Sequence, residues 1–553
     1  MLTVYIIKII LFNAFTTRKD LSLIFNRSLI TLLIVSFLVG LKSNNLLILK
    51  KGVSLLSGLF HNTSLSITFH LFIMFISLII IQLTAFLPRS FIDNTLDNLS
   101  KFLDNLIYNL ELSNKTKQQY TIIEYPLIIL FIIVGAMFLM SCNDIISIFL
   151  SIELQSYGLY LLCALYRNSE SSTGASLIYF LLGGLSSCFI LLAFAILYVN
   201  SGTSSLSSYY LLTNLSDSRH VISSLYLYSN SYISYCLVIL SIGFLFKISA
   251  APFHFWSPDV YDAIPTIVTT FVAAVAKISI LILLIEIVHY TGDLNIYNFN
   301  WINCILISSL LSLIVGTVLG LNQSRIKRLL AYSTISHLGF MLLAISVSST
   351  ESIQAFIFYL MQYSISNVNT FILIISIGYT IYMYERKEKY NKQLIEENNS
   401  PIQYTTQLKG YYFINPVIAI SLTIAIYSFV GVPPLIGFFA KQMVLSSALD
   451  KGYLFISLVA ILTSVISAVY YLNIIKEMFF FKSDYKLYKV QYEDNKNTSF
   501  YETKKNYLNY NITTLSTNLT ITISLLTLII LLFMLSSEEW LRMSNILAIT
   551  TFS

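Results

Sequence analysis

Four ionisable side chains stand deep inside apolar stretches of this sequence. Lys247 lies in GFLFKISAAPFHFW, Lys277 in VAAVAKISILILL, Lys441 in LIGFFAKQMVL, and Glu153 in ISIFLSIELQSYGLYLL. His337, in STISHLGFMLLAI, is the only histidine well inside such a stretch. A charge at the centre of a membrane-spanning helix costs about 2.5–3.5 kcal/mol on insertion scales. Three lysines and one glutamate at that depth therefore indicate a function.

The chemistry that suits these side chains is proton relay. Burial favours the neutral form of a lysine or a carboxyl group, and a nearby opposite charge favours the charged form. A lysine whose partner moves can therefore take up a proton in one state and release it in another. Glu153 is the only acid that we place at this depth, so we expect it to modulate a lysine, and the sequence leaves open which one.

Each of these residues also has a structural interpretation. A lysine near a helix end can extend its side chain to the membrane surface. Glu153 could form a structural ion pair, and His337 could be a hydrogen-bonded histidine between packed helices. Such extension to the membrane surface explains Lys277 least well, because some thirteen apolar or small residues precede it and eight follow it.

The composition excludes a soluble enzyme. Of 553 residues, 56% are hydrophobic and 11% are charged, whereas a soluble domain carries about 25% charged residues. The same composition excludes a disordered chain and a nucleic-acid-binding module. The five cysteines form no CxxC pair, so we predict no disulfide framework and no iron–sulfur site. The sequence also has no GxGxxG segment and no P-loop, so we predict no metal site, no bound cofactor and no redox residue in this chain.

The elements that must hold these residues are membrane-spanning helices, because open strands cannot satisfy their backbone hydrogen bonds in lipid. We predict an all-α polytopic membrane protein with about fourteen of them. The predicted spans are residues 1–16, 28–41, 67–87, 125–142, 144–166, 174–199, 233–256, 264–288, 301–321, 328–348, 354–383, 415–448, 452–475 and 516–536.

The basic residues support this count. The loops after odd-numbered spans hold 23 Lys and Arg, and the loops after even-numbered spans hold five. By the positive-inside rule the odd loops face the cytoplasm or the mitochondrial matrix, and both termini face the other side. Three longer polar stretches interrupt the spans, at 89–124, 384–414 and 476–515. The last two are predicted to be solvated loops or, alternatively, a docking surface for a neighbouring subunit.

Helix breakers accompany two of the deep lysines. Pro252 follows Lys247 in the seventh span, and Gly431, Pro433 and Pro434 precede Lys441 in the twelfth. Proline lacks an amide donor and clashes with the carbonyl four residues back, so we predict interrupted helices. The freed carbonyls would be those of residues 248 and 429.

The two interrupted spans lie five apart, which fits two inverted blocks made of spans 4–8 and 9–13. The order differs, because the lysine precedes the proline in one span and follows it in the other. Simple packing kinks are the alternative to a functional break.

Two strings carry a resemblance to a known family. PFHFWSPDVYDAIPT (252–266) and GVPPLIGFFAKQMVL (431–445) resemble the antiporter-like membrane-arm subunits of respiratory complex I, the proton-translocating NADH:ubiquinone oxidoreductase, and within them the subunit 2 branch. NQSRIKRLLAYSTISHLGF (322–340) is similar to a wider group that includes cation/proton antiporters. The resemblance covers about residues 125–475.

This resemblance implies two inverted five-helix repeats with broken helices 7 and 12 and a central polar axis. It implies that Glu153 partners Lys247, that Lys277 is the central lysine, and that Lys441 lies at the exit or inter-subunit end. His337 would be a linking residue.

The resemblance further implies four parts of the chain. These are an N-terminal part with three helices and a loop, two repeats, and a final loop with the last helix, at residues 1–124, 125–288, 289–476 and 477–553. NADH, FMN, iron–sulfur clusters and ubiquinone would belong to other subunits, and structural lipids could bind here. Partners would be neighbouring antiporter-like subunits and membrane lipids, not nucleic acid. The location would be the mitochondrial inner membrane, with the basic loops in the matrix.

Two other functions suit the deep charges. A stand-alone cation/proton antiporter would use the same buried lysines and glutamate. A membrane scaffold that moves no protons would hold them for structural reasons only.

Overall fold

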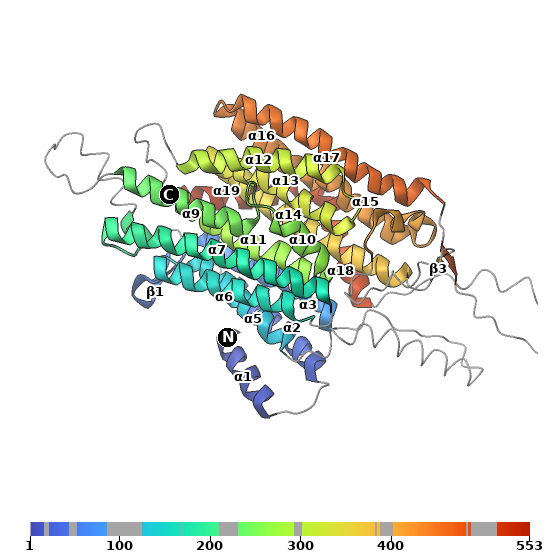
Figure 1. The fold of residues 1–553 in the computed structure, drawn as a ribbon, viewed down its shortest axis with the longest axis horizontal. Coiled ribbons are helices and arrows are strands. Elements are labelled where there is room, and N and C mark those ends of the chain that lie inside the picture. The colour runs from blue at the N-terminus through green and yellow to red at the C-terminus, as the bar shows by residue number, and fades with distance from the viewer. Residues whose placement is uncertain are drawn as a thin grey trace, which may run out of the picture.

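The computed structural model describes residues 2–15, 21–43, 52–85, 124–166, 169–209, 230–291, 301–381, 384–386, 402–482, 485–487 and 517–552. Most of these residues are helical, and the long helices run side by side in one direction across the molecule (Figure 1). Their ends gather at two opposite faces, as a membrane-spanning bundle requires. The predicted all-α architecture is confirmed.

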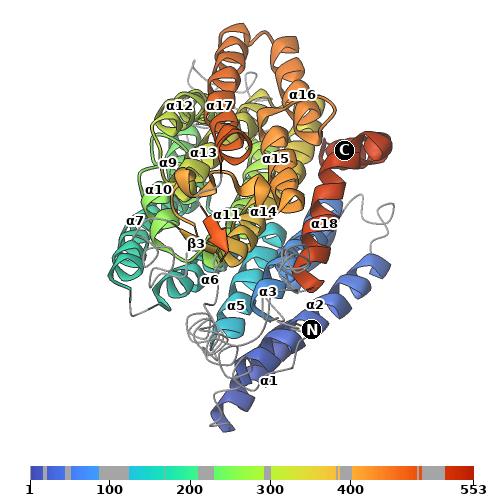
Figure 2. The ribbon, with the colours of Figure 1, turned by 90° about the vertical axis from the view of Figure 1, so that its right-hand side faces the viewer.

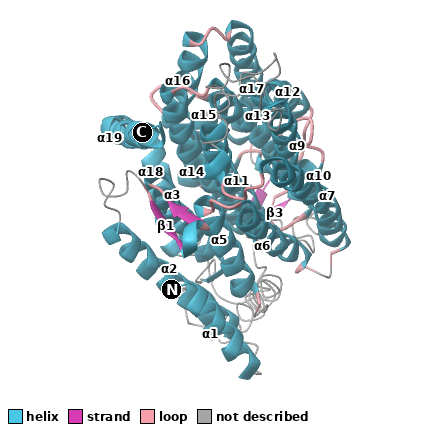
Figure 3. Ribbon diagram, turned by 90° about the vertical axis from the view of Figure 1, so that its left-hand side faces the viewer, coloured by secondary structure: helices cyan, strands magenta, loops and turns pink. Residues whose placement is uncertain are grey.

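The N-terminal part contributes three helices and a short hairpin. Helices α1 and α2 lie at the edge of the bundle, away from its centre (Figure 2). A two-stranded hairpin stands before α3 (Figure 3). The bounds are α1 Leu2–Phe15, α2 Leu21–Ser43, β1 Val53–Leu55, β2 Phe60–Asn62 and α3 Ser64–Ala85.

The remaining helices follow the apolar stretches of the sequence closely. The helices before residue 300 are α5 Tyr125–Ser141, α6 Ile145–Ala164, α7 Glu170–Ser201, α9 Asn230–Ile248, α10 Trp256–Ala263 and α11 Thr266–Thr291. The helices after it are α12 Trp301–Leu321, α13 Ile326–Val347, α14 Thr350–Ile381, α15 Pro416–Val430, α16 Ile436–Asp450, α17 Leu454–Phe480, α18 Thr517–Leu531 and α19 Ser537–Phe552.

Three helices form the centre of the bundle. In each of α11, α13 and α14, 94% of the 18 most apolar consecutive residues are buried within the protein, whereas in α7 only a third are. Figure 2 shows α11 and α14 surrounded by other helices. Helices with such enclosure contact protein rather than lipid on every side, so polar side chains on them can find protein partners.

Ten described helices are long and apolar enough to cross a membrane, and four shorter apolar helices accompany them. Each predicted span coincides with a helix or with an interrupted pair, although the exact count of fourteen crossings stays a prediction. The second helix begins at Leu21, earlier than predicted. The chain also continues as α19 beyond the predicted end of the last span at 536.

Both predicted interruptions are present. The first separates α9, which ends at Ile248, from α10, which begins at Trp256. The second separates α15, which ends at Val430, from α16, which begins at Ile436. Each interruption lies where proline removes a backbone donor.

The prediction of a solvated loop at 384–414 is wrong for its last part. Ile402, Leu408 and Tyr411 are fully buried. Residues 403–405 bond to the chain that precedes α13, the Gly410 amide donates to the Glu477 carbonyl of α17, and the Tyr411 hydroxyl contacts Thr380 of α14. The Ile326 amide donates to the Gln403 carbonyl at 2.8 Å. Residues 387–401 lie outside the described part of the chain.

A second contact joins two of the long polar stretches. Strand β3 (Tyr384–Arg386) pairs antiparallel with β4 (Tyr485–Leu487). The loop after α14 and the loop after α17 therefore meet at this ladder, on the right-hand face in Figure 1. The remaining long polar stretch, 89–124, lies outside the described residues except for Glu124.

Candidate functional site: a line of buried lysines

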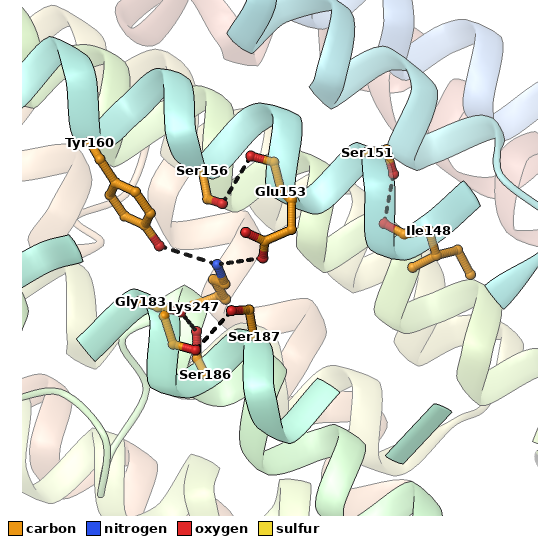
Figure 4. Close-up of polar contacts among 10 residues, drawn as sticks. Ile148, Ser151, Glu153, Ser156, Tyr160, Gly183, Ser186, Ser187 and Lys247 are labelled. Atoms are coloured by element: carbon orange, nitrogen blue, oxygen red, sulfur yellow. Dashed lines mark hydrogen bonds and ion pairs between the residues drawn. The ribbon is translucent and has the colours of Figure 1, made fainter. Parts of the chain in front are cut away.

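The first buried lysine lies between a carboxylate and a phenol. Glu153 and Tyr160 stand seven residues apart on α6, which places them on one face of the helix. From α9, Lys247 Nζ approaches the Glu153 carboxylate at 3.6 Å and donates to the Tyr160 hydroxyl at 3.3 Å. Figure 4 shows the ammonium group between these two partners.

The Glu153–Lys247 pair is enclosed and loose. The side chains are 14% and 7% exposed, so little water screens the two charges. At 3.6 Å the contact is electrostatic rather than a hydrogen bond, and the nearer carboxylate oxygen of Glu153 has no hydrogen-bond partner within the described chain. A pair of this kind attracts strongly and yet can separate without breaking a hydrogen bond.

The second buried lysine joins the two halves of the chain. Lys277, on α11, is 4% exposed. Its Nζ donates to Ser249 Oγ at 3.3 Å and to Thr334 Oγ1 at 3.2 Å. Ser249 belongs to the interruption after α9, whereas Thr334 belongs to α13. Lys277 is therefore held by hydroxyl groups, with the ring of Tyr261 5.5 Å from its ammonium group.

The buried histidine has a hydroxyl group at each ring nitrogen. The Tyr359 hydroxyl of α14 lies 2.7 Å from His337 Nδ1, and the Tyr471 hydroxyl of α17 lies 3.3 Å from Nε2. A neutral imidazole donates from one nitrogen and accepts at the other. The ring can therefore accept a proton on one side and give one up on the other.

Helix α13 connects these groups. Thr334, His337 and Phe340 follow one another at three-residue spacing. Thr334 contacts Lys277, and the Phe340 ring lies 5.6 Å from Lys441 Nζ. One enclosed helix thus contacts the central lysine, carries the histidine and reaches the third lysine.

The third buried lysine uses the second helix break directly. Lys441 Nζ, on α16, donates to the carbonyls of Phe429 and Val430 at 2.8 and 2.9 Å. Phe429 carries the carbonyl predicted to be freed by Pro433. The last carbonyls of a helix have no partner within it and carry partial negative charge. The end of α15 therefore holds the ammonium group without a carboxylate.

Backbone geometry at the breaks follows from the residues there. Gly431 ends α15 with φ 88°, a left-handed conformation that glycine adopts readily. A Cβ at Gly431 would lie 3.2 Å from Lys441 Cδ. Pro252 lies in the seven residues between α9 and α10, and Pro434 lies between α15 and α16. Ser249 also has a left-handed φ, 67°, which is unusual for serine.

Glu286 corrects the prediction that Glu153 is the only deep acid. It stands nine residues after Lys277 on α11, two residues before the predicted end of that span. The helix continues to Thr291, so Glu286 is inside it and partly buried. It lies within the predicted span 264–288, and its apolar neighbours on both sides were the signal in the sequence.

A fourth lysine is buried where a loop was predicted. Lys327 is 2% exposed in the first turn of α13, and its Nζ donates to the Ile264 carbonyl at 2.6 Å. Its neighbours Arg325 and Arg328 made the segment look like a basic loop. The polar residues Asn322–Ser324 precede these basic residues, so nothing in the local sequence predicted the burial of Lys327.

The tyrosines around these groups were not singled out from the sequence. Tyr160, Tyr359 and Tyr471 supply hydroxyl partners, but the chain has 38 tyrosines, and only three-dimensional contact distinguishes these. Within the described residues, no group of three or more His, Cys, Asp or Glu side chains gathers as a metal site would require.

Comparison with known proteins identifies relatives across the chain. The family described as NADH:quinone oxidoreductase/Mrp antiporter, TM, matches residues 142–467. NADH-ubiquinone oxidoreductase chain 2 of Rhizopus oryzae is 39% identical over 552 residues, covering 99% of each chain. NADH-quinone oxidoreductase subunit N of Rhodobacter capsulatus is 34% identical over 65% of this chain and 68% of its own.

Solved structures share the fold. A chain of respiratory complex I from Thermus thermophilus superposes with a TM-score of 0.69 at 22% identity, covering 98% of this chain and 97% of its own. A chain of the Mrp complex from Dietzia sp. gives a TM-score of 0.72 at 16% identity, covering 100% and 96%. The resemblance predicted from residues 252–266 and 431–445 is confirmed.

Proposed function

The chain belongs to the NADH:quinone oxidoreductase/Mrp antiporter family, and on that basis we propose that it is a proton-translocating membrane-arm subunit of respiratory complex I. The observation that carries this proposal is the 39% identity to a complex I chain 2 over 99% of both chains. The enzyme is the whole complex, an NADH:ubiquinone reductase that moves protons. The chain itself is a multi-pass membrane protein.

A line of buried polar side chains supports a proton relay within this chain. This polar line consists of Glu153, Lys247, Lys277, His337 and Lys441. A charged lysine can give a proton to a hydroxyl oxygen or a water molecule, while that group gives its own proton to the next acceptor. Glu153 holds the charge on Lys247 when the two are close, and their separation favours release. Lys277 would pass the proton from the first half to the second, where His337 and Lys441 would carry it onward.

The chain's organisation follows the same proposal. The two interrupted helices would belong to inverted repeats at 125–288 and 289–476, flanked by 1–124 and 477–553. The protein would reside in the mitochondrial inner membrane, with its basic loops in the matrix and both termini in the intermembrane space. Neighbouring antiporter-like subunits and lipids would be its partners.

Redox chemistry is assigned to other subunits. NADH, FMN, iron–sulfur clusters and ubiquinone would bind there, and this chain would receive the energy as a change in charge or conformation. The Glu153–Lys247 pair suits such a signal, because a loose buried pair responds to a small displacement.

A native gel of mildly solubilised membranes tests membership of the complex. We expect this chain to co-migrate with a large NADH-oxidising band. Migration alone at low mass, with ion counterflow in vesicles that contain only this chain, would instead establish a stand-alone antiporter.

Lys277→Met tests the pumping role. We expect NADH-driven proton uptake by sealed membrane vesicles to fall about tenfold or more, since the variant removes a buried proton carrier. The matched control is Lys451→Met, because Lys451 is exposed at the end of α16 and outside the polar line. Uptake at the wild-type level in an assembled Lys277→Met complex would indicate a scaffold.

A further inference from the structure

Helix α10 stands between the two lysines of the first half. It is an eight-residue segment, Trp256–Ala263, that follows α9 with Lys247 and precedes α11 with Lys277. Its side chains Trp256, Val260 and Tyr261 are buried. A short helix in this place can affect both lysines at once.

The N-terminal end of α10 is connected to Lys247 through a series of aromatic rings. Trp256 donates from Nε1 to the Phe246 carbonyl at 3.0 Å, and its ring stacks on Tyr179 with centroids 4.6 Å apart. The Tyr179 ring meets the Tyr160 ring edge-on at 4.7 Å. Tyr160 in turn accepts the hydrogen bond from Lys247. The position of Trp256 therefore fixes one partner of this lysine.

The second end of α10 contacts Lys277. Tyr261 is fully buried, and its ring centroid lies 5.5 Å from Lys277 Nζ. An ammonium group at this distance from an aromatic face is stabilised in its charged form. The placement of Tyr261 thus contributes to how readily Lys277 holds a proton.

The anchor of α10 comes from the other half of the chain. From α13, Lys327 Nζ donates to the carbonyl of Ile264 at 2.6 Å and reaches that of Asp262 at 3.5 Å. These carbonyls belong to the last turn of α10 and the residue that ends it, where a helix lacks internal donors and favours a cation. Because Lys327 is 2% exposed, this contact is shielded from water and salt.

Two outer ion pairs flank this anchor. Arg325 meets the Asp262 carboxylate at 2.5 Å, and Arg328 pairs with Asp259. The hydrogen bond to Asp262 raises the pKa of Arg325 above its ordinary value. Both arginines are more than a third exposed, and exposed pairs contribute little. Lys327 is therefore the principal anchor.

We propose that Lys327 is a positioning residue for proton translocation, which holds α10 from α13 so that Tyr261 and Trp256 set the surroundings of Lys277 and Lys247 together. This inference rests on the proposed pumping function. It assigns to the basic segment before α13 a task in the relay, rather than only in membrane orientation.

Lys327→Met in the assembled complex is the test, with Lys451→Met as the control for loss of a lysine. Pumping is measured as NADH-driven proton uptake per assembled complex. A native thiol reports displacement beside α10, since Cys163 is fully buried on α6 three residues after Tyr160, whose ring meets the Tyr179 ring that stacks on Trp256. Its alkylation by N-ethylmaleimide is followed by peptide mass spectrometry, with buried Cys142 as the reference thiol.

We expect Lys327→Met to lower proton uptake about tenfold, as misplacement of relay groups does, and to raise Cys163 alkylation about tenfold relative to Cys142. Lys451→Met should change neither quantity. Wild-type proton uptake together with wild-type alkylation in an assembled Lys327→Met complex would overturn the inference, and so would lower uptake without any change at Cys163.

A milder variant keeps the test decisive if Lys327→Met does not assemble. Lys327→Gln keeps a donor for the Ile264 carbonyl but loses the charge, so it should lower uptake and raise Cys163 alkylation severalfold. Wild-type uptake in an assembled Lys327→Gln complex would overturn the inference.

The two proposals fail in different ways. If Lys277→Met lowers uptake and Lys327→Met does not, the positioning role alone is wrong. If neither variant lowers uptake, the pumping function is wrong, whatever the thiol reports about α10.

Discussion

The two interrupted helices hold their lysines differently. At the break between α9 and α10, Lys247 precedes the interruption and faces the Glu153 carboxylate at 3.6 Å. At the break between α15 and α16, Lys441 follows the interruption and donates to two carbonyls within 2.9 Å. One lysine thus depends on a side-chain charge, whereas the other depends on backbone dipoles at a helix end.

This difference separates a responsive group from a fixed one. A carboxylate on a side chain can move or take up a proton, so the charge on Lys247 can change with it. The carbonyls of Phe429 and Val430 belong to the backbone and can release Lys441 only if α15 or α16 shifts. We therefore expect the first break to receive the coupling signal and the second to respond through helix movement.

The largest expected effect is that of Lys247→Met. It should reduce NADH-driven proton uptake about tenfold or more, and it should also reduce the amount of assembled complex. Removing one member of a buried ion pair costs about 3–5 kcal/mol, because it leaves the other charge unpaired. Proton uptake and the native-gel band are the two measurements.

The double variant Glu153→Gln with Lys247→Met sharpens this test. It removes both charges, so it should restore assembly without restoring uptake. A double variant that assembles as poorly as Lys247→Met would mean that the pair does not account for the loss.

Lys441→Met should impair uptake about as strongly while assembly suffers less. It leaves carbonyls rather than a carboxylate without a partner, at a cost of about 1–3 kcal/mol. The comparison between the two breaks requires a stronger native-gel band for Lys441→Met than for Lys247→Met. Equal bands would contradict the assignment of a charge partner to one break only.

Exchanging the left-handed residues of the two breaks should give smaller effects, on assembly at one break and on proton uptake at the other. Gly431→Ser places a side chain against Lys441 in a backbone conformation that costs about 1–3 kcal/mol, so it should lower assembly. Ser249→Gly relaxes the backbone but removes an acceptor from Lys277, so it should lower uptake severalfold at normal assembly. Normal uptake in Ser249→Gly would mean that the hydroxyl does not serve Lys277.

The smallest expected effect is that of Tyr160→Phe. It removes one hydrogen bond to Lys247 and keeps the ring that packs on Tyr179. A single hydrogen bond contributes about 1 kcal/mol, so uptake should fall no more than about fivefold. A loss as large as that of Lys247→Met would make the phenol, rather than Glu153, the main partner.

The sequence could predict the groups whose burial follows from local pattern. Lys247, Lys277 and Lys441 stand in long apolar runs, and proline beside two of them predicts the helix breaks. Pro433 also predicts that the Phe429 carbonyl has no partner within its own helix, and in the structure Lys441 donates to it. The carbonyl of Ile248 is predicted to be free in the same way, because Pro252 lies four residues later, and this stays a prediction.

Groups held by distant partners could not be predicted. Lys327 is buried because the end of α10, about sixty residues earlier, lies over it, and nothing in its own neighbourhood indicates that contact. Long-range packing, rather than local pattern, determines this burial. Glu286 differs, because its apolar neighbours were visible in the sequence although its position near the predicted helix end did not mark it as deep.

The partners of Lys277 have a consequence for biogenesis. Ser249 is synthesised 28 residues before Lys277, whereas Thr334 is synthesised 57 residues after it. If the chain is inserted into the membrane from its N-terminus onward, α11 is inserted when Ser249 has been synthesised and Thr334 has not. Insertion of α11 must tolerate an incompletely satisfied lysine until α13 arrives. The insertion machinery or an assembly factor is thus expected to shelter this helix from lipid during that interval.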